Sequence, residues 1–244
     1  MKFSLNLSSN ALKIIAVISM TLDHIGLMFF PQYSIFRIIG RMAFPIFAFM
    51  IAEGTKYTKN KLKYFLLVLS VGVICQVAYT LYSRDIYFNI LIAFSISILL
   101  IYVLQILKGM IFDSNKPIAV KIFFFCYFIL TVFVVYIFNL LFDVDYGFFG
   151  CLLPVFASFF HLPKNISTCE RVKRFDSIKL SILMLSLGML FLTLDLGIDQ
   201  AWSFSVIPLL FLYSGSRGRL KMKYFFYFYY PAHLLILEAV SMII

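Results

Sequence analysis

The sequence predicts an all-α integral membrane protein, a polytopic transmembrane helix bundle of about nine spans with the N-terminus cytoplasmic and the C-terminus outside. Hydrophobic residues make up 63% of the 244 residues and charged residues only 13%. The mean hydropathy is +0.98, and the 30 Phe and 15 Tyr exceed what a water-facing surface could hide. Nine stretches approach the length of about 20 apolar residues that a helix needs to cross a bilayer. They are residues 11–30, 35–55, 63–82, 87–107, 117–141, 147–161, 178–196, 199–214 and 224–243.

The basic residues indicate the orientation of these spans. With nine spans, the loops on one side of the membrane hold every lysine and arginine except Arg37, Arg41 and Arg84. Cytoplasmic loops carry such an excess, so this side is predicted to be cytoplasmic. The placement also accounts for the net charge of +10, and no nucleic-acid partner is predicted. Lipid is the expected surrounding of the chain.

The chain is predicted to form a single domain over residues 1–244, because it contains neither a Gly/Ser/Pro-rich linker nor a convincing internal repeat. The four cysteines have no close pair, so neither a disulfide framework nor a zinc site is expected. No metal is predicted.

In the first span, Asp23 and His24 are the residues that a bilayer tolerates badly. Lys13 marks the inner end of this span, and Asp23 follows ten residues later, roughly 15 Å deeper and close to the midplane. An ionisable group at that depth costs roughly 3 kcal/mol or more, so intramembrane charges point to a functional site.

The second span carries Arg37 and Arg41, four residues apart and therefore on one helix face, and Glu53 near its inner end. Gly40 allows another backbone to approach closely, and Pro45 frees a carbonyl group near Arg41. These features pack helices or open a cavity. Together with two guanidinium groups they indicate a site for an anionic group.

The middle of the chain, residues 62–142, is informative only through its hydropathy. The Phe-rich run 122–142 is expected to be a lipid-facing helix at the periphery of the bundle. The sixth and eighth stretches are short. Residues 161–179 are predicted to be a basic cytoplasmic loop.

The loop before the last span contains Arg217 and Arg219 among glycines and can contact phosphates, although the positive-inside rule explains its charge equally well. The last span carries Tyr230 and His233, the latter ten residues beyond Lys223. If the first, second and ninth helices are neighbours, Asp23, Arg41 and His233 share one layer. Asp23 is then expected to meet an arginine and His24 the substrate region, and a buried ion pair that only holds two helices together is the alternative.

Several motifs resemble the TraX family, named for the F-pilin acetylation protein. Along the chain they are residues 13–16, 23–26, 36–49, 53–54, 145–150, 213–218 and 227–237. The resemblance implies a multi-pass acetyltransferase of the bacterial inner (cytoplasmic) membrane, which uses acetyl-CoA as co-substrate to acetylate the amino terminus of a pilin subunit.

Carried over to this sequence, the resemblance implies a site built from Asp23, His24, Arg37, Arg41, Glu53 and His233. We expect His24 to act as general base, with His233 as its rival, and Asp23 to tune it. Arg37 or Arg41 is expected to bind CoA phosphate or the oxyanion, with Arg217 and Arg219 as further candidates for the phosphates and Tyr230 as a further site residue. Because CoA is cytoplasmic and Arg37 and Arg41 lie toward the outer face, either a deep channel exists or they bind the acceptor.

The acceptor is left open between a peptide amine, a secreted-peptide precursor, a lipid and a glycan. Two other classes of function remain. Intramembrane Asp, Glu, His and Arg residues also form the relays of proton-coupled transporters, and a non-catalytic membrane chaperone for a small peptide would need no histidine base.

Overall fold

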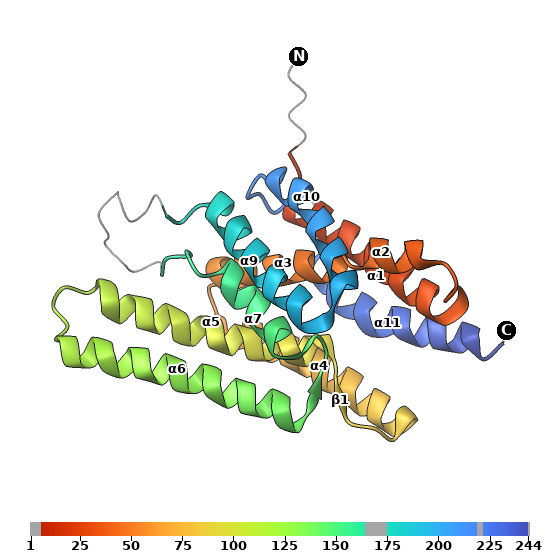
Figure 1. The fold of residues 1–244 in the computed structure, drawn as a ribbon, viewed down its shortest axis with the longest axis horizontal. Coiled ribbons are helices and arrows are strands. Elements are labelled where there is room, and N and C mark those ends of the chain that lie inside the picture. Colours follow the sequence, from red (N-terminus) through yellow and green to blue (C-terminus); the bar gives the residue numbers. More distant parts are fainter. Residues whose placement is uncertain (1–5, 164–174, 219–221, 244) are drawn as a thin grey trace, which may run out of the picture. The chain divides into compact units, whose positions relative to one another are not determined.

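The computed structural model describes residues 6–163, 175–218 and 222–243. Its regular elements are α1 (Ser9–Phe29), α2 (Ser34–Gly40), α3 (Ala43–Tyr57), α4 (Lys61–Ser83), β1 (Tyr87–Phe88), α5 (Ile90–Phe112), α6 (Ile118–Leu141), β2 (Asp143–Val144), α7 (Gly147–Ala157), α9 (Ile178–Leu196), the 3-10 helix η1 (Ile198–Val206), α10 (Ile207–Phe211) and α11 (Lys223–Ser241). The chain is therefore almost entirely helical (Figure 1), as predicted. It divides into two compact units, residues 1–50 with 189–244 and residues 51–188.

Within the described residues, six helices are long and apolar enough to cross a membrane. They correspond to α1, α2 with α3, α4, α5, α6 and α9. The sixth expected span is the 11-residue helix α7, and the eighth is divided between η1 and α10. Eleven helical residues extend about 16 Å, half the thickness of a hydrocarbon core. The chain is a multi-pass membrane protein, while the count of nine spans and the sides of the termini remain predictions.

The second expected span is not one continuous helix but breaks between α2 and α3. The Arg41 N–H donates to the Arg37 carbonyl at 3.1 Å, and the Met42 N–H donates three residues back to Ile39 at 3.3 Å. Pro45 has no N–H to continue the ladder and is tolerated in the first turn of a new helix. Arg41 consequently lies at the end of α2 rather than inside a helix.

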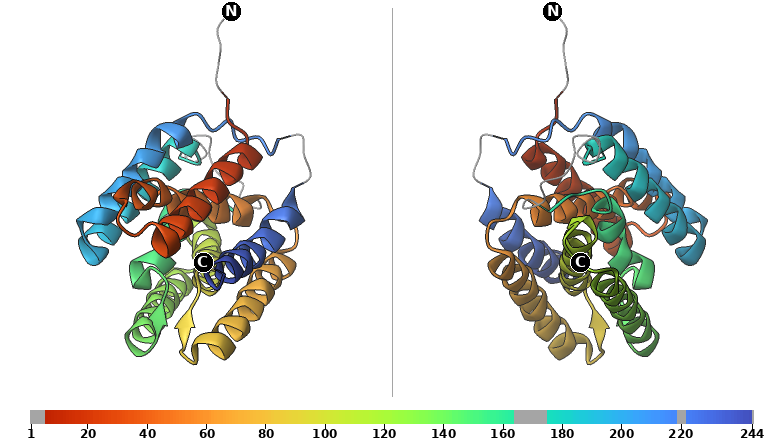
Figure 2. Two further views of the ribbon diagram at one scale, coloured as in Figure 1. Left: turned by 90° about the vertical axis from the view of Figure 1, so that its right-hand side faces the viewer. Right: turned by 90° about the vertical axis from the view of Figure 1, so that its left-hand side faces the viewer.

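In the first unit, α1 packs against α2 and α11, and Figure 2 shows α11 beside α1. Gly26 permits the close approach of α2, because a Cβ there would lie 2.3 Å from the Cβ of Phe36. At the start of α1, the N–H groups of Ser9 and Asn10 donate to the carbonyls of Ser216 and Arg217 at 2.8 and 3.3 Å. Loop 212–218 thus satisfies two of the N–H groups that a helix leaves unpaired at its beginning.

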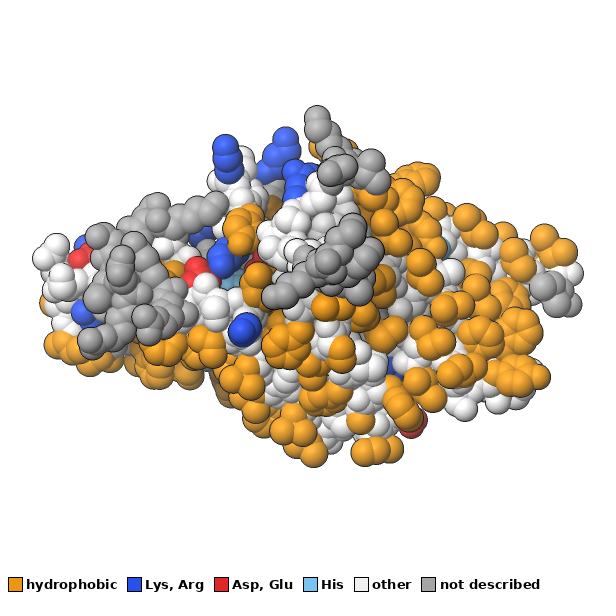
Figure 3. All heavy atoms as spheres, turned by 90° about the horizontal axis from the view of Figure 1, so that it is seen from above, with side chains coloured by type: hydrophobic (Ala, Val, Ile, Leu, Met, Phe, Trp, Pro, Cys, Tyr) orange, Lys and Arg blue, Asp and Glu red, His pale blue; other side chains and the backbone are white. Residues whose placement is uncertain are grey.

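In the second unit, α4, α6 and α7 all pack against α5. Half-buried side chains of α6 cover the core residues Leu100, Ile101 and Leu104 of α5, and the two helices lie side by side in Figure 1. None of the residues of α6 is buried, which confirms its expected place at the periphery. Hydrophobic side chains cover much of the face in Figure 3, as a surface in contact with lipid requires.

Candidate functional site: a buried histidine pair

Asp23 of α1 and Arg37 of α2 form an ion pair in the first unit. Nη1 of Arg37 donates to Oδ2 of Asp23 at 2.7 Å. Gly40, at the end of α2, leaves room for the carboxylate, since a Cβ there would lie 2.2 Å from Asp23 Oδ1. That second oxygen is buried and has no hydrogen-bond partner in the described part of the chain. The expectation that Asp23 meets an arginine is confirmed, and the arginine is Arg37.

The imidazole rings of His24 and His233 meet edge to face, with centroids 5.2 Å apart and planes at 84°. His24 Nδ1 lies 2.8 Å from the carbonyl oxygen of Met20, and His233 Nδ1 lies 3.1 Å from that of Tyr229. Because a carbonyl oxygen can only accept a hydrogen bond, each Nδ1 carries a hydrogen and is the donor. In the neutral ring the lone pair is then on Nε2. Nε2 of the buried His233 has no partner within the described residues.

Two tyrosines of α11 surround His233. Tyr229 stacks on its ring at 5.4 Å and 8°, and Tyr230 lies at 5.7 Å. The Tyr229 hydroxyl also lies 2.7 Å from the hydroxyl of Thr21 and joins α11 to α1. Tyr230, expected as a further site residue, lies beside His233. Sequence reasoning missed Tyr229, although its position four residues before His233 puts both on one helix face.

The other three arginines of the predicted site differ in where they lie. Arg41, half-buried at the end of α2, is close enough to Asp23 for a favourable charge interaction. The side chain of Arg217 is exposed, and its loop binds the start of α1 through backbone carbonyls. Arg219 lies outside the described residues.

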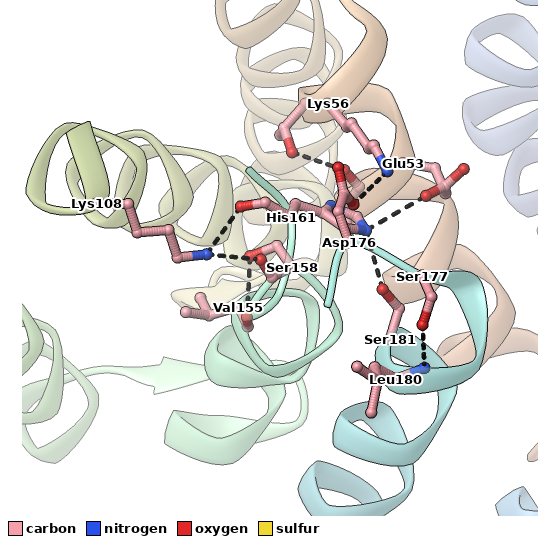
Figure 4. Close-up of polar contacts among 12 residues, drawn as sticks. Glu53, Lys56, Lys108, Val155, Ser158, His161, Asp176, Ser177, Leu180 and Ser181 are labelled. Carbon is pink, nitrogen blue, oxygen red and sulfur yellow. Dashed lines mark hydrogen bonds and ion pairs between the residues drawn. The ribbon is translucent and has the colours of Figure 1, made fainter. Parts of the chain in front are cut away.

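Glu53 belongs to the second unit, with a different set of partners (Figure 4). Its Oε1 lies 3.4 Å from Nε2 of His161, and the Ser181 hydroxyl lies 3.0 Å from the same nitrogen. All three side chains are buried. The grouping of Glu53 with Asp23, His24 and His233 in one site stays a prediction, and the contact described here for Glu53 is with His161.

Two lysines frame this second cluster. Lys56 pairs with Asp176 at 2.5 Å, and the Lys108 ammonium group donates to the carbonyls of Ser158 and His161 at 3.1 and 3.0 Å. His161 follows α7 and lies outside the six apolar spans. Burial, together with the positive charges of Lys56 and Lys108, lowers the pKa of His161 to about 3. The ring is therefore neutral at pH 7, and its contact with Glu53 is no ion pair.

The described residues include no group of three or more His, Cys, Asp or Glu side chains that could hold a metal ion. What the histidine pair offers is a set of acceptors. Asp23 Oδ1 and His233 Nε2 are the unpartnered atoms, and both accept hydrogen bonds. A group that completes them must donate, as an amine or a hydroxyl does.

The fold and this site define a class: a multi-pass helical membrane protein whose first and last described helices hold a histidine pair next to a carboxylate–guanidinium pair. Comparison with known proteins gives the family. The family model of TraX, described as "TraX protein", matches residues 8–241, so this chain belongs to the TraX family.

Two relatives match a shorter segment. An uncharacterized protein of Rickettsia prowazekii, RP591, is 45% identical over 83 residues, which are 34% of this chain and 32% of that protein. The probable fimbrial assembly protein FimC, serogroup H1, of Dichelobacter nodosus is 36% identical over 84 residues, 33% of this chain and 34% of the relative. The matched segment thus spans about a third of each relative. No solved structure matches the chain significantly.

Proposed function

We propose that this protein is an integral membrane acetyltransferase that transfers the acetyl group of acetyl-CoA to an amine, and that the histidine pair is its acid–base centre. The observation that carries the proposal is the proton arrangement of the pair. The Nδ1–H of each ring donates to a backbone carbonyl, which leaves the two Nε2 atoms as bases, with the side chain of His24 half-buried and that of His233 buried. Membership of the TraX family supports the same reaction.

The chemistry needs one base and no metal. The acceptor nitrogen attacks the thioester carbonyl, and Nε2 of His24 takes the proton that this nitrogen loses. Collapse of the tetrahedral intermediate breaks the C–S bond, and the proton passes from the imidazolium to the departing thiolate. The products are an acetamide and CoA with a free thiol. His233, in contact with His24, helps to position the ring and is the second possible base.

An amine suits this site better than an anionic acceptor. The unpartnered atoms accept hydrogen bonds, and an amine, which attacks in its neutral form, has N–H groups that can donate to them. The relative from Dichelobacter nodosus is a probable fimbrial assembly protein, which supports a pilus subunit as the source of the acceptor amine. A peptide amine is accordingly the acceptor we favour over a lipid or glycan hydroxyl.

Arg37 is neutralised by Asp23, so the phosphates of CoA require another partner. Arg41, at the end of α2, is one candidate, and Arg217 and Arg219 are the others, in the loop before α11. Binding of CoA by Arg41 requires a channel from the cytoplasmic side, whereas binding by the loop does not.

The decisive experiment uses the purified chain in detergent with acetyl-CoA and a short peptide that has a free amino terminus. We expect release of the CoA thiol, followed colorimetrically, together with a gain of one acetyl group by the peptide in mass spectrometry. The same peptide with a blocked amino terminus is the control and should remain unmodified. His24→Gln should abolish both signals.

The two other classes of function give different results in this assay. A proton-coupled transporter moves solute across vesicles without CoA and releases no thiol. A peptide chaperone binds the peptide equally well in the wild type and in the variants His24→Ala and His233→Ala. Thiol release that depends on the peptide amine excludes both as the whole function.

A further inference from the structure

The helix η1 carries a second group of buried polar atoms without partners, apart from the histidine pair. Both Nε2 and Oε1 of Gln200 and the hydroxyl of Ser203 are buried and make no hydrogen bond within the described residues. Gln200 is 2% exposed and Ser203 is 0% exposed. Each unmade hydrogen bond of a buried group destabilises the fold, so such atoms in a native structure call for a ligand or ordered water.

The two side chains lie on the same face. Residues three apart eclipse one another in a 3-10 helix, and Gln200, Ser203 and Val206 form the buried stripe of η1. η1 packs against α10 and against α2, the helix that carries Arg37. The stripe therefore belongs to the same unit as the histidine pair and is joined to it through α2.

The chemistry of the unpartnered atoms distinguishes between ligands. A phosphate would require donors only, and an ammonium group would require acceptors only. The Gln200 carboxamide presents both, two N–H donors beside one carbonyl acceptor, and the Ser203 hydroxyl also does both. A peptide group, with its own N–H and C=O, is the complement of such a set.

We propose that Gln200 and Ser203 bind the main chain of the acceptor peptide, close to the amino terminus that the histidine pair acetylates. This inference rests on the proposed function and deepens it. The acceptor-only histidine pair takes the terminal amine, and the mixed donor–acceptor set on η1 takes a peptide group further along the same chain. Hydrogen bonds to the main chain bind a peptide in one direction without selecting its side chains.

The test is a binding measurement, so that it does not depend on acetyl transfer. Calorimetry compares a tripeptide amide of small apolar residues with its analogue in which an ester replaces the first peptide bond, removing that N–H. We expect the wild type to bind the ester on the order of tenfold more weakly, as the loss of one hydrogen bond implies. In Gln200→Leu the peptide and the ester should bind equally, and Ser203→Ala should weaken both.

The control is Ser205→Ala on the exposed face of η1, which should keep the wild-type preference. Thermal unfolding separates a ligand site from a structural one. Exchange of an unpartnered carboxamide for leucine should leave the unfolding temperature of the free protein unchanged or raise it. A lowered temperature with an unchanged preference for the peptide would overturn the inference. Peptide preference in a protein that never releases CoA thiol would support this site and refute the acetyltransferase.

Discussion

The rings of His24 and His233 meet edge to face with centroids 5.2 Å apart, although 209 positions separate the two residues in the sequence. The Nδ1–H of each ring donates a hydrogen bond to a carbonyl of its own helix. If Nε2 of His24 is the base, His24→Gln should lower kcat for acetyl transfer by about 10² to 10⁴. His233→Gln should lower it as well, because His24 loses the ring that it packs on. Steady-state kinetics with acetyl-CoA and a peptide amine measure both effects.

The double variant distinguishes one catalytic unit from two independent residues. Residues that act as a unit lose activity non-additively, so the double variant should be scarcely worse than His24→Gln alone. If each single variant keeps wild-type kcat, the histidine pair is not the acid–base centre.

The close contact of Gly40 with Asp23 predicts that Gly40→Ala destabilises the protein by about 1–3 kcal/mol, as overpacking does. A Cβ at this position would lie 2.2 Å from Asp23 Oδ1 and would displace the ion pair with Arg37. Gly109 in α5 is the matched control, since nothing lies within 4 Å of a Cβ placed there. Gly109→Ala should be neutral or stabilising because alanine is the better helix former. Equal unfolding temperatures for the two variants would refute this prediction.

Removal of Arg37 tests whether the pair with Asp23 has a role in stability. Arg37→Leu leaves the half-buried carboxylate of Asp23 without its partner. We expect the free energy of unfolding to fall by on the order of 1–3 kcal/mol, a value between those of exposed and of buried ion pairs. Arg37 is 34% exposed, which keeps the effect below that of a fully buried pair. Combining Arg37→Leu with Asp23→Asn should recover part of the loss. Strictly additive effects in denaturant unfolding would mean that the two side chains are not coupled.

Acetyl-CoA binding should weaken on the order of tenfold in Arg41→Ala if the guanidinium group holds a phosphate. Calorimetry with the purified protein measures this, with the exposed Lys116 between α5 and α6 as control in Lys116→Ala. Unchanged binding in Arg41→Ala combined with weakened binding in Arg217→Ala would assign the phosphates to the loop before α11.

The buried, neutral His161 predicts a specific dependence of stability on pH. Its pKa is about 3 in the folded protein, against 6.5 as the ordinary value, so the unfolded chain binds the extra proton between these pH values. Stability is therefore complete above pH 6.5 and falls as the pH drops toward 3. Over pH 7 to 4.5 the loss is on the order of 2–3 kcal/mol.

Unfolding of the wild type and of His161→Gln across this range isolates the contribution, since all other ionisable groups are common to the two proteins. The difference in stability between the two proteins should shrink as the pH falls. A difference that does not change with pH would show that the pKa of His161 is the same in the folded and the unfolded chain.

The residues of this site that the sequence predicts are the ionisable ones in apolar stretches, because hydrocarbon cannot solvate them. Asp23, His24 and His233 stand out because so few ionisable residues lie in apolar stretches, and Asp23 needs an opposite charge at its own depth. The break after Gly40 and the pairing of Glu53 with His161 could not be foreseen in this way. The former depends on the local turn at Arg41 and Met42, and the latter on a tertiary contact between residues more than a hundred positions apart.

η1 was expected to be part of a membrane span, because its apolar residues outnumber Gln200 and Ser203. A 3-10 helix and a transmembrane helix have similar composition over nine residues, and only the backbone distinguishes them. The unpartnered atoms of Gln200 could not be predicted from the sequence, because whether a side chain finds hydrogen-bond partners depends on its neighbours in the fold.

The backbone tie between the start of α1 and loop 212–218 has a consequence for the order of assembly. The ribosome makes residues 1–50 before residues 51–188, and only after both does it make Tyr213, the bridge partner of Leu7. In a nascent chain His24 therefore lacks its counterpart, and the histidine pair is complete only after α11 has been synthesised.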